Sequence, residues 1–267
     1  MKKVKTIILR TAGTNCDMET AHAFRLAGAD ADLVHINALI KKKGLFDKYH
    51  ILAVPGGFTY GDDVASGKIL ANEIKFNLKE QLYRFVRSGK LIIGICNGFQ
   101  VLVKMGLLPG IKGLGCGMEA TLSLNDSGKF NAKWVYLGQG SGGREKCVWV
   151  RGLPEVLYLP IAHAEGKFIP GNGRVLSDLR KNGQIVFRYT DKEGKASGAP
   201  YNPNGSVDDI AGICDPSGRI LGMMPHPERH VSYLQHPNWR RAGGRDPDMG
   251  VGLRIFENGV NFVKNNF

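Results

Sequence analysis

Short apolar runs alternate with helical patterns through the first hundred residues of the chain. Strands that alternate with helices in this way form a parallel sheet covered by helices. Gly residues follow several of these segments, where they suit turns and helix ends. The sequence predicts strands at 4–9, 31–36, 51–54 and 91–95 and helices at 17–27, 69–86 and 97–105. The feature that most constrains the fold is therefore this alternation, which indicates an α/β protein.

After residue 118 the pattern changes to hairpin-like pieces separated by Gly-containing turns. We expect strands at 120–124, 133–137, 147–150, 156–161, 185–189, 210–214 and 219–224 and a last helix at 252–263. The first five strands are interpreted as an antiparallel extension of the sheet, and the last two as a pair joined by the tight turn at 215–218. No Pro/Ser-rich linker divides the 267 residues, of which 43% are hydrophobic, so we expect one domain over 1–267.

Charge and cysteine content restrict the class of protein. The net charge is +12, but the basic clusters, such as Lys41–Lys43, are shorter than the basic block of a nucleic-acid site. A solvated basic surface is favoured, with an anionic substrate or an acidic partner subunit still compatible. Five cysteines without a C-x-x-C pair indicate neither a disulfide framework nor a metal site. No run approaches the roughly 18 apolar residues of a membrane span, so we expect a cytoplasmic protein.

The segment Gly94-Ile95-Cys96-Asn97-Gly98 lies between a predicted strand and a predicted helix. It has the form of a nucleophile elbow, with Cys in the place of Ser. The helix N-terminus that follows favours the thiolate, which is the nucleophilic form. A buried, inert Cys96 is the structural alternative, but the glycine pair and the strand-to-helix context favour a nucleophile. Cys16 also precedes a helix, yet it lacks the glycine pair and is interpreted as structural.

A thiolate that attacks an amide needs a proton carrier and an oriented base partner. His226 and Glu228 supply one candidate pair, and His163 and Glu165 have the same spacing. The residues alone leave both pairs open. Backbone amides at an elbow and at a glycine-rich loop can form an oxyanion hole. We expect the amide of Asn97 to act together with that of Gly57 or Phe58.

Three segments carry a resemblance to a known family. They are 55–62 (PGGFTYGD), 94–100 (GICNGFQ) and 223–229 (MMPHPER), supported by 13–17, 163–166, 202–206 and 210–212. In this order they resemble the class I (triad) glutamine amidotransferases, and more narrowly the glutaminase subunits of phosphoribosylformylglycinamidine synthase. The resemblance extends over about residues 4–230 and so includes most of the chain.

The resemblance implies a flavodoxin-like three-layer fold with an antiparallel β extension and a triad of Cys96, His226 and Glu228. Cys96 would attack the side-chain amide of L-glutamine, forming a thioester that water hydrolyses to glutamate, with release of ammonia. Gln100 and the loop 58–62 would lie near the substrate.

The resemblance also implies a partner. A separate synthetase subunit would use the ammonia, with ATP and magnesium, to convert formylglycinamide ribonucleotide to its amidine in purine biosynthesis. The sequence leaves open whether a small third subunit is needed as well. The chain itself would bind no cofactor, no metal, no nucleic acid and no membrane.

Two departures from the family pattern lead to a hypothesis. Ala164 stands where the family has a second Gly, and the segments 138–144 and 231–250 look longer than in the smallest members. We hypothesise that these two segments dock the synthetase or cover the site. Other readings are a free-standing cysteine hydrolase on a similar fold, a triad amidotransferase for another acceptor, and a non-catalytic basic binding module.

Overall fold

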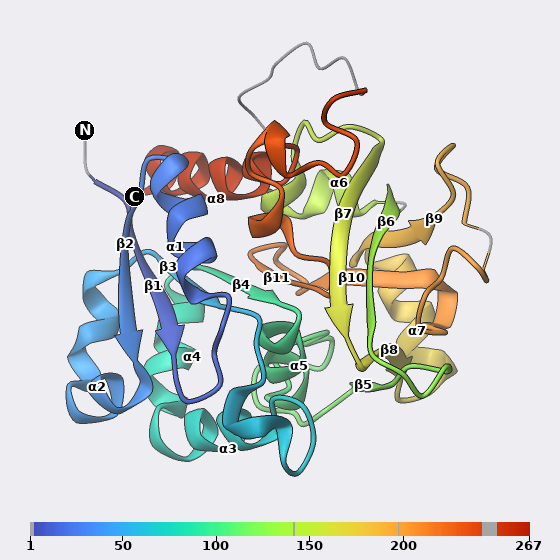
Figure 1. The fold of residues 1–267 in the computed structure, drawn as a ribbon. Coiled ribbons are helices and arrows are strands. Elements are labelled where there is room, and N and C mark those ends of the chain that lie inside the picture. The colour runs from blue at the N-terminus through green and yellow to red at the C-terminus, as the bar shows by residue number, and fades with distance from the viewer. Residues whose placement is uncertain (1–2, 141, 197, 242–249) are drawn as a thin grey trace.

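One nine-stranded sheet runs through the computed structural model, which describes residues 3–140, 142–196, 198–241 and 250–267 (Figure 1). The strand order is β2-β1-β3-β4-β11-β10-β9-β6-β7. Its strands are β1 (Lys5–Arg10), β2 (Asp30–His35), β3 (Ile51–Val54), β4 (Leu91–Ile95), β6 (Asn131–Gln139), β7 (Val156–His163), β9 (Ile185–Thr190), β10 (Ile210–Cys214) and β11 (Ile220–Met223). A separate two-stranded sheet joins β5 (Ala120–Leu124) to β8 (Glu165–Pro170).

The relative orientation of neighbouring strands in the large sheet changes at β11. Strands β2, β1, β3, β4 and β11 are parallel, and the pairs β11–β10, β10–β9, β9–β6 and β6–β7 are antiparallel. Strand β11 returns from late in the chain to pair with β4, with Met223 opposite Ile95. The predicted parallel α/β sheet with an antiparallel extension is therefore confirmed.

Helices cover both faces of the parallel half (Figure 1). Their bounds are α1 (Asp17–Leu26), α2 (Ile36–Lys41), α3 (Lys68–Asn77), α4 (Lys79–Arg87), α5 (Asn97–Lys104), α6 (Gly143–Lys146), α7 (Gly173–Lys181) and α8 (Leu253–Asn266). Helix α1 packs on α8 through the rings of Phe24 and Phe256, whose centroids are 5.0 Å apart. Helix α5 packs on β4 and on α3. All five residues of β4 are buried between the helical layers.

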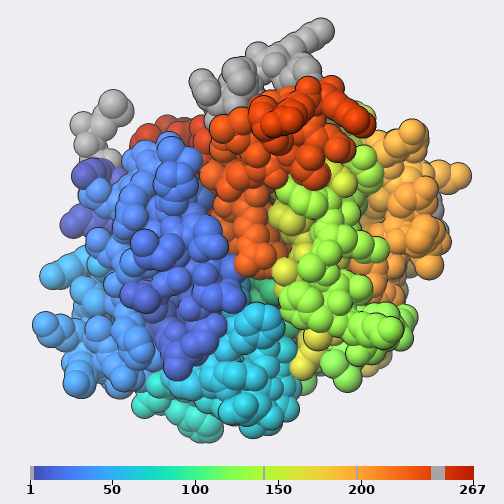
Figure 2. Space-filling view, in the orientation of Figure 1, coloured from blue at the N-terminus to red at the C-terminus, as the bar shows by residue number. Residues whose placement is uncertain are grey.

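The segment that follows β11 crosses the molecule from the sheet to the surface. In Figure 2 this segment, drawn in orange, fills the space between the N-terminal region, drawn in blue, and the green region around β6. It packs against both α1 and β7. Residues from the two ends of the chain therefore meet where the loops after β1 and β11 come together.

Two of the predicted elements differ in the structure. The predicted helix 69–86 is two helices, because Leu78 leaves the helical region (φ −129°, ψ 9°) and is fully buried. The predicted strand 147–150 is wrong, since Val148–Val150 form a 3₁₀ turn. This turn buries the indole of Trp149, whose N–H donates to the Arg219 carbonyl over 3.0 Å.

Four helices and strands were absent from the prediction, namely α2, the short α6, β8 and α7. Helix α2 follows β2 directly, and β8 and α7 lie between two predicted strands. Helix α7 carries a readable signal, since the Asn172 side chain caps it by accepting from the Val175 amide over 3.0 Å. None of the helices in the described part of the chain is both long and apolar enough to span a membrane.

The glycine-rich segment 138–144 packs closely on β9. The Gly140 amide donates to the Val186 carbonyl over 2.9 Å, and a Cβ at Gly140 or Gly143 would lie only 2.0 or 2.4 Å from the Ile185 carbonyl oxygen. These glycines therefore have a packing role, and docking by this segment stays a prediction. Of the other hypothesised segment, residues 242–249 lie outside the described residues.

Candidate active site

A pocket of about 290 Å³ lies where the loops after β1, β3, β4 and β11 meet. In open α/β sheets ligands bind at this carboxyl edge of the parallel strands. The pocket is lined by Asn15, Cys16, Gly57, Phe58, Cys96, Phe130, Ala162, His226 and Arg229. The nucleophile and the histidine that the sequence predicts therefore share one pocket with Gly57 and Phe58.

Cys96 occupies a sharp turn between β4 and α5. Its backbone has φ 52° and ψ −106°, a region that residues other than Gly rarely adopt and that costs energy. A Cβ at Gly98 would lie 1.8 Å from the Val54 carbonyl oxygen, and one at Gly94 would lie 2.6 Å from Leu102 Cδ1. Both glycines are therefore needed for the close packing of the turn, as in a nucleophile elbow.

The Cys96 side chain is 5% exposed, and its Sγ lies 3.6 Å from the Ala162 carbonyl oxygen. The Cys96 amide donates to the Met223 carbonyl over 2.8 Å. This bond ties the turn to β11, the strand that leads to His226. Cys96 directly precedes the first turn of α5, so its backbone lies at the positive end of that helix.

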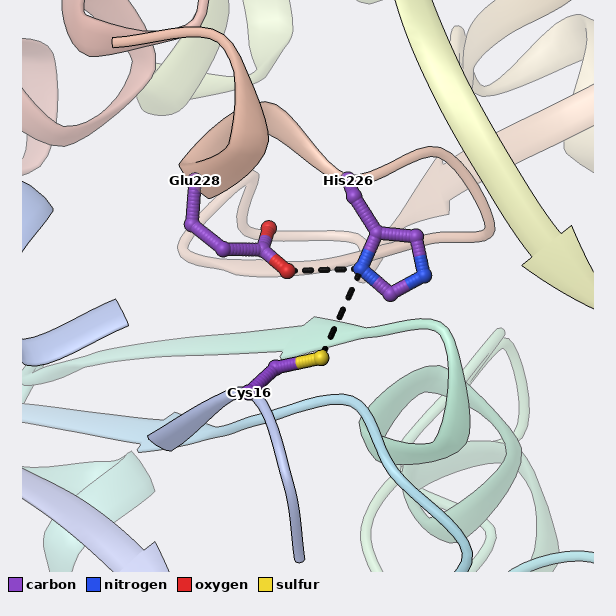
Figure 3. A group of neighbouring side chains, drawn as sticks. All are labelled: Cys16, His226 and Glu228. Carbon is purple, nitrogen blue, oxygen red and sulfur yellow. Dashed lines mark hydrogen bonds and ion pairs between the residues drawn. The ribbon is translucent and has the colours of Figure 1, made fainter. Parts of the chain in front are cut away.

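His226 and Glu228 form a buried pair just after β11. Both residues are 1% exposed, and His226 Nδ1 lies 2.6 Å from Glu228 Oε1 (Figure 3). The His226 amide donates to the Pro160 carbonyl over 2.8 Å, which fixes the backbone of this turn. Because a carboxylate only accepts, Nδ1 carries the proton and donates it. Nε2 is buried without a hydrogen-bond partner among the described residues, so its lone pair is free to take a proton.

The surroundings of His226 favour the imidazolium. Burial lowers the pKa of His226, but the negative charge of Glu228, followed by that of Cys96, outweighs burial and holds the pKa well above 6.5. A histidine in this state can stabilise a thiolate and later protonate a leaving group.

The alternative pair, His163 and Glu165, is separated by the fold. His163 Nδ1 lies 3.1 Å from the Asn125 Oδ1, while the Glu165 carboxylate accepts from the Ser66 amide. Burial, and then the charge of His226, lower the pKa of His163 to about 3, so its ring is neutral at working pH. The geometry brings His226 and Glu228 together and not the second pair, which the residue pattern alone left open.

The two candidate loop amides for an oxyanion hole are not equivalent. The Phe58 amide donates to the Gly13 carbonyl over 2.9 Å and is therefore committed to the backbone. Gly57 lines the pocket with φ 148°, and a Cβ there would lie 2.6 Å from the Gly13 carbonyl oxygen. Asn97 begins α5, where the first amides have no partner within the helix. Gly57 and Asn97 remain the candidate donors.

Gln100 lies behind the pocket in a buried polar network. Its Nε2 donates to the Glu165 carbonyl, and its Oε1 accepts from Asn97 Nδ2 over 2.9 Å. Asn97 Nδ2 also donates to Asp62 over 3.1 Å, while its Oδ1 accepts from the Thr59 hydroxyl over 2.7 Å. The network joins the elbow to the loop after β3, so Gln100 positions the pocket wall in this structure and does not line the pocket.

The sequence interpretation missed the position of Cys16. Its Sγ is buried 3.9 Å from His226 Nδ1, and Arg229 Nη2 lies 3.1 Å from the same sulfur (Figure 3 shows the first contact). Cys16, His226 and Glu228 offer ligand atoms within 4.8 Å of one another. The Arg229 cation beside the sulfur opposes a metal ion there, and Nδ1 already bonds to the carboxylate. The position of Cys16 after β1, at the same edge as Cys96, was the available signal.

Comparisons with known proteins place the chain among amidotransferases. A family model of CobB/CobQ-like glutamine amidotransferase domains matches residues 3–263. Phosphoribosylformylglycinamidine synthase subunit PurQ of Dehalococcoides mccartyi is 49% identical over 265 residues, which cover 99% of each chain. The subunit PurQ of a Methanococcus maripaludis strain is 42% identical over 97% of each chain. A chain in the solved structure of PurLQS from Thermotoga maritima matches with a TM-score of 0.73 and 29% identity, covering 98% of this chain and 100% of that one.

Proposed function

Because the chain belongs to the family of CobB/CobQ-like glutamine amidotransferase domains, we propose that it is the glutaminase subunit of a phosphoribosylformylglycinamidine synthase. Relatives that match over nearly the whole chain carry this name, and a solved PurLQS complex contains a chain of the same fold. The observation that carries the chemistry is the pocket shared by Cys96 and the His226–Glu228 pair.

The first half-reaction forms a thioester. The Cys96 thiolate attacks the side-chain amide carbon of L-glutamine, and the negative charge moves to the amide oxygen. The amides of Gly57 and Asn97 would donate to that oxygen. The intermediate then collapses, the C–N bond breaks, and the His226 imidazolium gives its Nε2 proton to the leaving ammonia. Glu228 holds the Nδ1 proton throughout and keeps the ring oriented.

The second half-reaction releases glutamate. Neutral His226 takes a proton from water, and the hydroxide attacks the thioester carbon. The C–S bond breaks, which restores the Cys96 thiolate and the His226 imidazolium. The raised pKa of His226 supports this cycle, because the imidazolium is the resting form that the first step needs.

The ammonia is used by a partner in this proposal. The relatives are named as subunits of the synthase, and the solved PurLQS structure is of such an assembly. We assign the ATP and magnesium of the amination to the synthetase partner and no cofactor to this chain. L-glutamine as the substrate and the cytoplasm as the location likewise remain predictions.

The proposal is tested with Cys96→Ala in the complex reconstituted with its synthetase. Loss of the nucleophile should abolish amination with glutamine as the nitrogen source and leave amination with added ammonia unchanged. An electrophilic glutamine analogue should label Cys96 in the unmodified chain, and excess glutamine should suppress the adduct. The readouts are product formation and mass spectrometry of the modified peptide.

Cys147→Ala is the matched control, since Cys147 is also buried but does not line the pocket. It should keep both activities. Equal loss of glutamine-dependent and ammonia-dependent activity in Cys96→Ala would contradict a purely glutaminase role. Turnover of peptides or esters without a synthetase would instead support a free-standing hydrolase, and strongly salt-dependent nucleic-acid binding would support a binding module.

A further inference from the structure

Cys16 is held rigidly at the start of α1. Its side chain has no exposed surface, its amide donates to the Gly56 carbonyl over 3.2 Å, and its carbonyl accepts from the Thr20 amide over 3.0 Å. A Cβ at Gly56 would lie 3.2 Å from the sulfur and 2.8 Å from His226 Cε1. The absence of a side chain at Gly56 therefore allows the sulfur and the imidazole to lie side by side.

The hydrogen-bond partners of the Cys16 sulfur define its role as an acceptor. The thiol proton points to Asn15 Oδ1 at 3.1 Å, since an amide oxygen only accepts. A sulfur lone pair then accepts from Arg229 Nη2 over 3.1 Å, while His226 Nδ1, whose proton is donated to Glu228, lies 3.9 Å from the sulfur. Figure 3 shows the sulfur on the same side of the imidazole as Glu228.

Arg229 is a potential competitor for Glu228. It directly follows Glu228 in the chain; partial burial lowers its pKa, but the neighbouring Cys16 sulfur and Glu228 carboxylate outweigh burial and raise that pKa above its ordinary value. A guanidinium binds a carboxylate more strongly than it binds a neutral sulfur. Yet among the described residues Arg229 forms no ion pair within 4.0 Å, and its side-chain hydrogen bond is to the Cys16 sulfur.

We propose that Cys16 is a positioning residue that holds the Arg229 guanidinium away from Glu228, so that the carboxylate stays committed to His226. The inference rests on the proposed triad and adds a residue to its support. Without the sulfur, Arg229 would turn to the adjacent carboxylate and weaken the hold of Glu228 on the imidazolium. The ionisable groups that face His226 are Cys96, Glu228, Cys16 and His163.

The test compares Cys16→Ala, Cys16→Val and Cys16→Ser in the reconstituted complex. Ala and Val cannot accept a hydrogen bond, so each should lower kcat for glutamine about tenfold with KM within about twofold. The pH at which Cys96 is half-maximally alkylated by chloroacetamide should rise by about one unit, because a less stable imidazolium supports the thiolate less. Ser keeps an acceptor and should stay close to the unmodified complex.

The decisive variant removes the competitor as well. In Cys16→Ala/Arg229→Gln no guanidinium is left to capture Glu228, so the double variant should recover most of the lost kcat and the original alkylation profile. If the double variant is as impaired as Cys16→Ala, or if Cys16→Ala and Cys16→Val leave the profile unchanged, the proposal is overturned. Cys16→Val fills the site of the sulfur and keeps the test available where Cys16→Ala does not fold.

Cys147→Ala again serves as the control for truncating a buried cysteine and should not move the alkylation profile. The two proposals fail in different ways. Activity that survives in Cys96→Ala contradicts the triad itself. An inactive Cys96→Ala combined with an unchanged Cys16→Ala contradicts only the role of Cys16.

Discussion

Cys96 combines a buried side chain with a backbone conformation that is costly for any residue other than Gly. A strained backbone conformation of this kind persists only where the surrounding structure holds it in place. Here it is held by the hydrogen bond from the Cys96 amide to the Met223 carbonyl and by the close packing of Gly98 on Val54. The sulfur is therefore presented by the backbone of the turn, and the side chain has little freedom of its own.

Glu228→Gln should move the pH dependence of glutamine hydrolysis. The charge of Glu228 raises the pKa of His226, so the imidazolium that protonates ammonia persists well above pH 6.5. Without that charge the alkaline limb of the kcat profile should shift to lower pH, and kcat should fall. The measurement is the pH profile of glutamate release by the complex.

Glu165→Gln makes the same change in the other histidine–glutamate pair and is the matched control. Because Glu165 bonds to the Ser66 amide and not to His163, the alkaline limb should not move. A shift of equal size in both variants would argue against the specific role given to Glu228.

His163 should make the folded chain sensitive to acid. Burial lowers its pKa from 6.5 in the unfolded chain to about 3 in the folded one, so the unfolded chain binds more protons between these values. Above pH 6.5 His163 does not reduce the free energy of unfolding. As the pH falls from 6.5 toward 3, protonation of His163 in the unfolded chain lowers that free energy progressively. In His163→Asn this loss should be absent, so the free energy of unfolding relative to the unmodified chain should rise by about 1.4 kcal/mol per pH unit below 6.5.

Urea unfolding at several pH values measures this difference. His22→Asn is the control, since His22 is exposed on α1 and its replacement should leave the pH dependence as it was. Equal slopes for His163→Asn and the unmodified chain would refute the buried neutral state of His163.

The residue pattern could identify Cys96 because the elbow is a local signal of strand, glycine pair and helix. It could not choose between two pairs with identical spacing, since His163 and His226 differ only in what the fold places beside them. Nor could it find the competition for Glu228, which depends on Cys16 from the loop after β1. Pairings between distant segments are what a single sequence leaves undetermined.

At the scale of elements, the turn between β4 and α5 has the least tolerance for added volume. Gly98→Ala would place a Cβ 1.8 Å from the Val54 carbonyl oxygen, so β3 or α5 must move. We expect a loss of about 1–3 kcal/mol in the free energy of unfolding and a loss of glutaminase activity.

Gly173→Ala is the matched change at the start of α7, where a Cβ meets nothing within 4 Å. It should alter the free energy of unfolding by less than about 0.5 kcal/mol. Denaturant unfolding and glutamate release measure both variants, and equal tolerance of the two alanines would show that the elbow packing is not restrictive.

Local pattern predicted the strands of the parallel half well, most clearly β3, β4 and β11, which are apolar runs buried along their whole length. The strand expected at 147–150 was wrong because Val148, Trp149 and Val150 are buried for another reason, the packing of a 3₁₀ turn against α8. The break at Leu78 was also missed, since a buried Leu fits the apolar period of a single helix equally well. Burial alone does not report backbone conformation.

For the whole molecule, the continuous sheet predicts cooperative unfolding. Strands from both halves of the chain belong to the nine-stranded sheet, and β11 pairs with β4 near its centre. Urea unfolding should give one transition, with Trp fluorescence and far-ultraviolet circular dichroism coinciding. The fluorescence follows the later half through Trp134 and Trp149, while the dichroism follows helices of both halves. Two separated transitions would contradict the single domain expected over 1–267.

The pairing of β4 with β11 also decides which motions can reach the active site. The nucleophile follows one strand and its histidine follows the neighbouring strand at the level where Met223 lies opposite Ile95, with the Cys96 amide bonded across the pair. Local opening of the outer strands or motion of the surface loops leaves Cys96 and His226 in the same relative position. In a partially open state Cys96 and His226 therefore still lie next to each other. They separate only when the hydrogen bonds between β4 and β11 are replaced by hydrogen bonds to water.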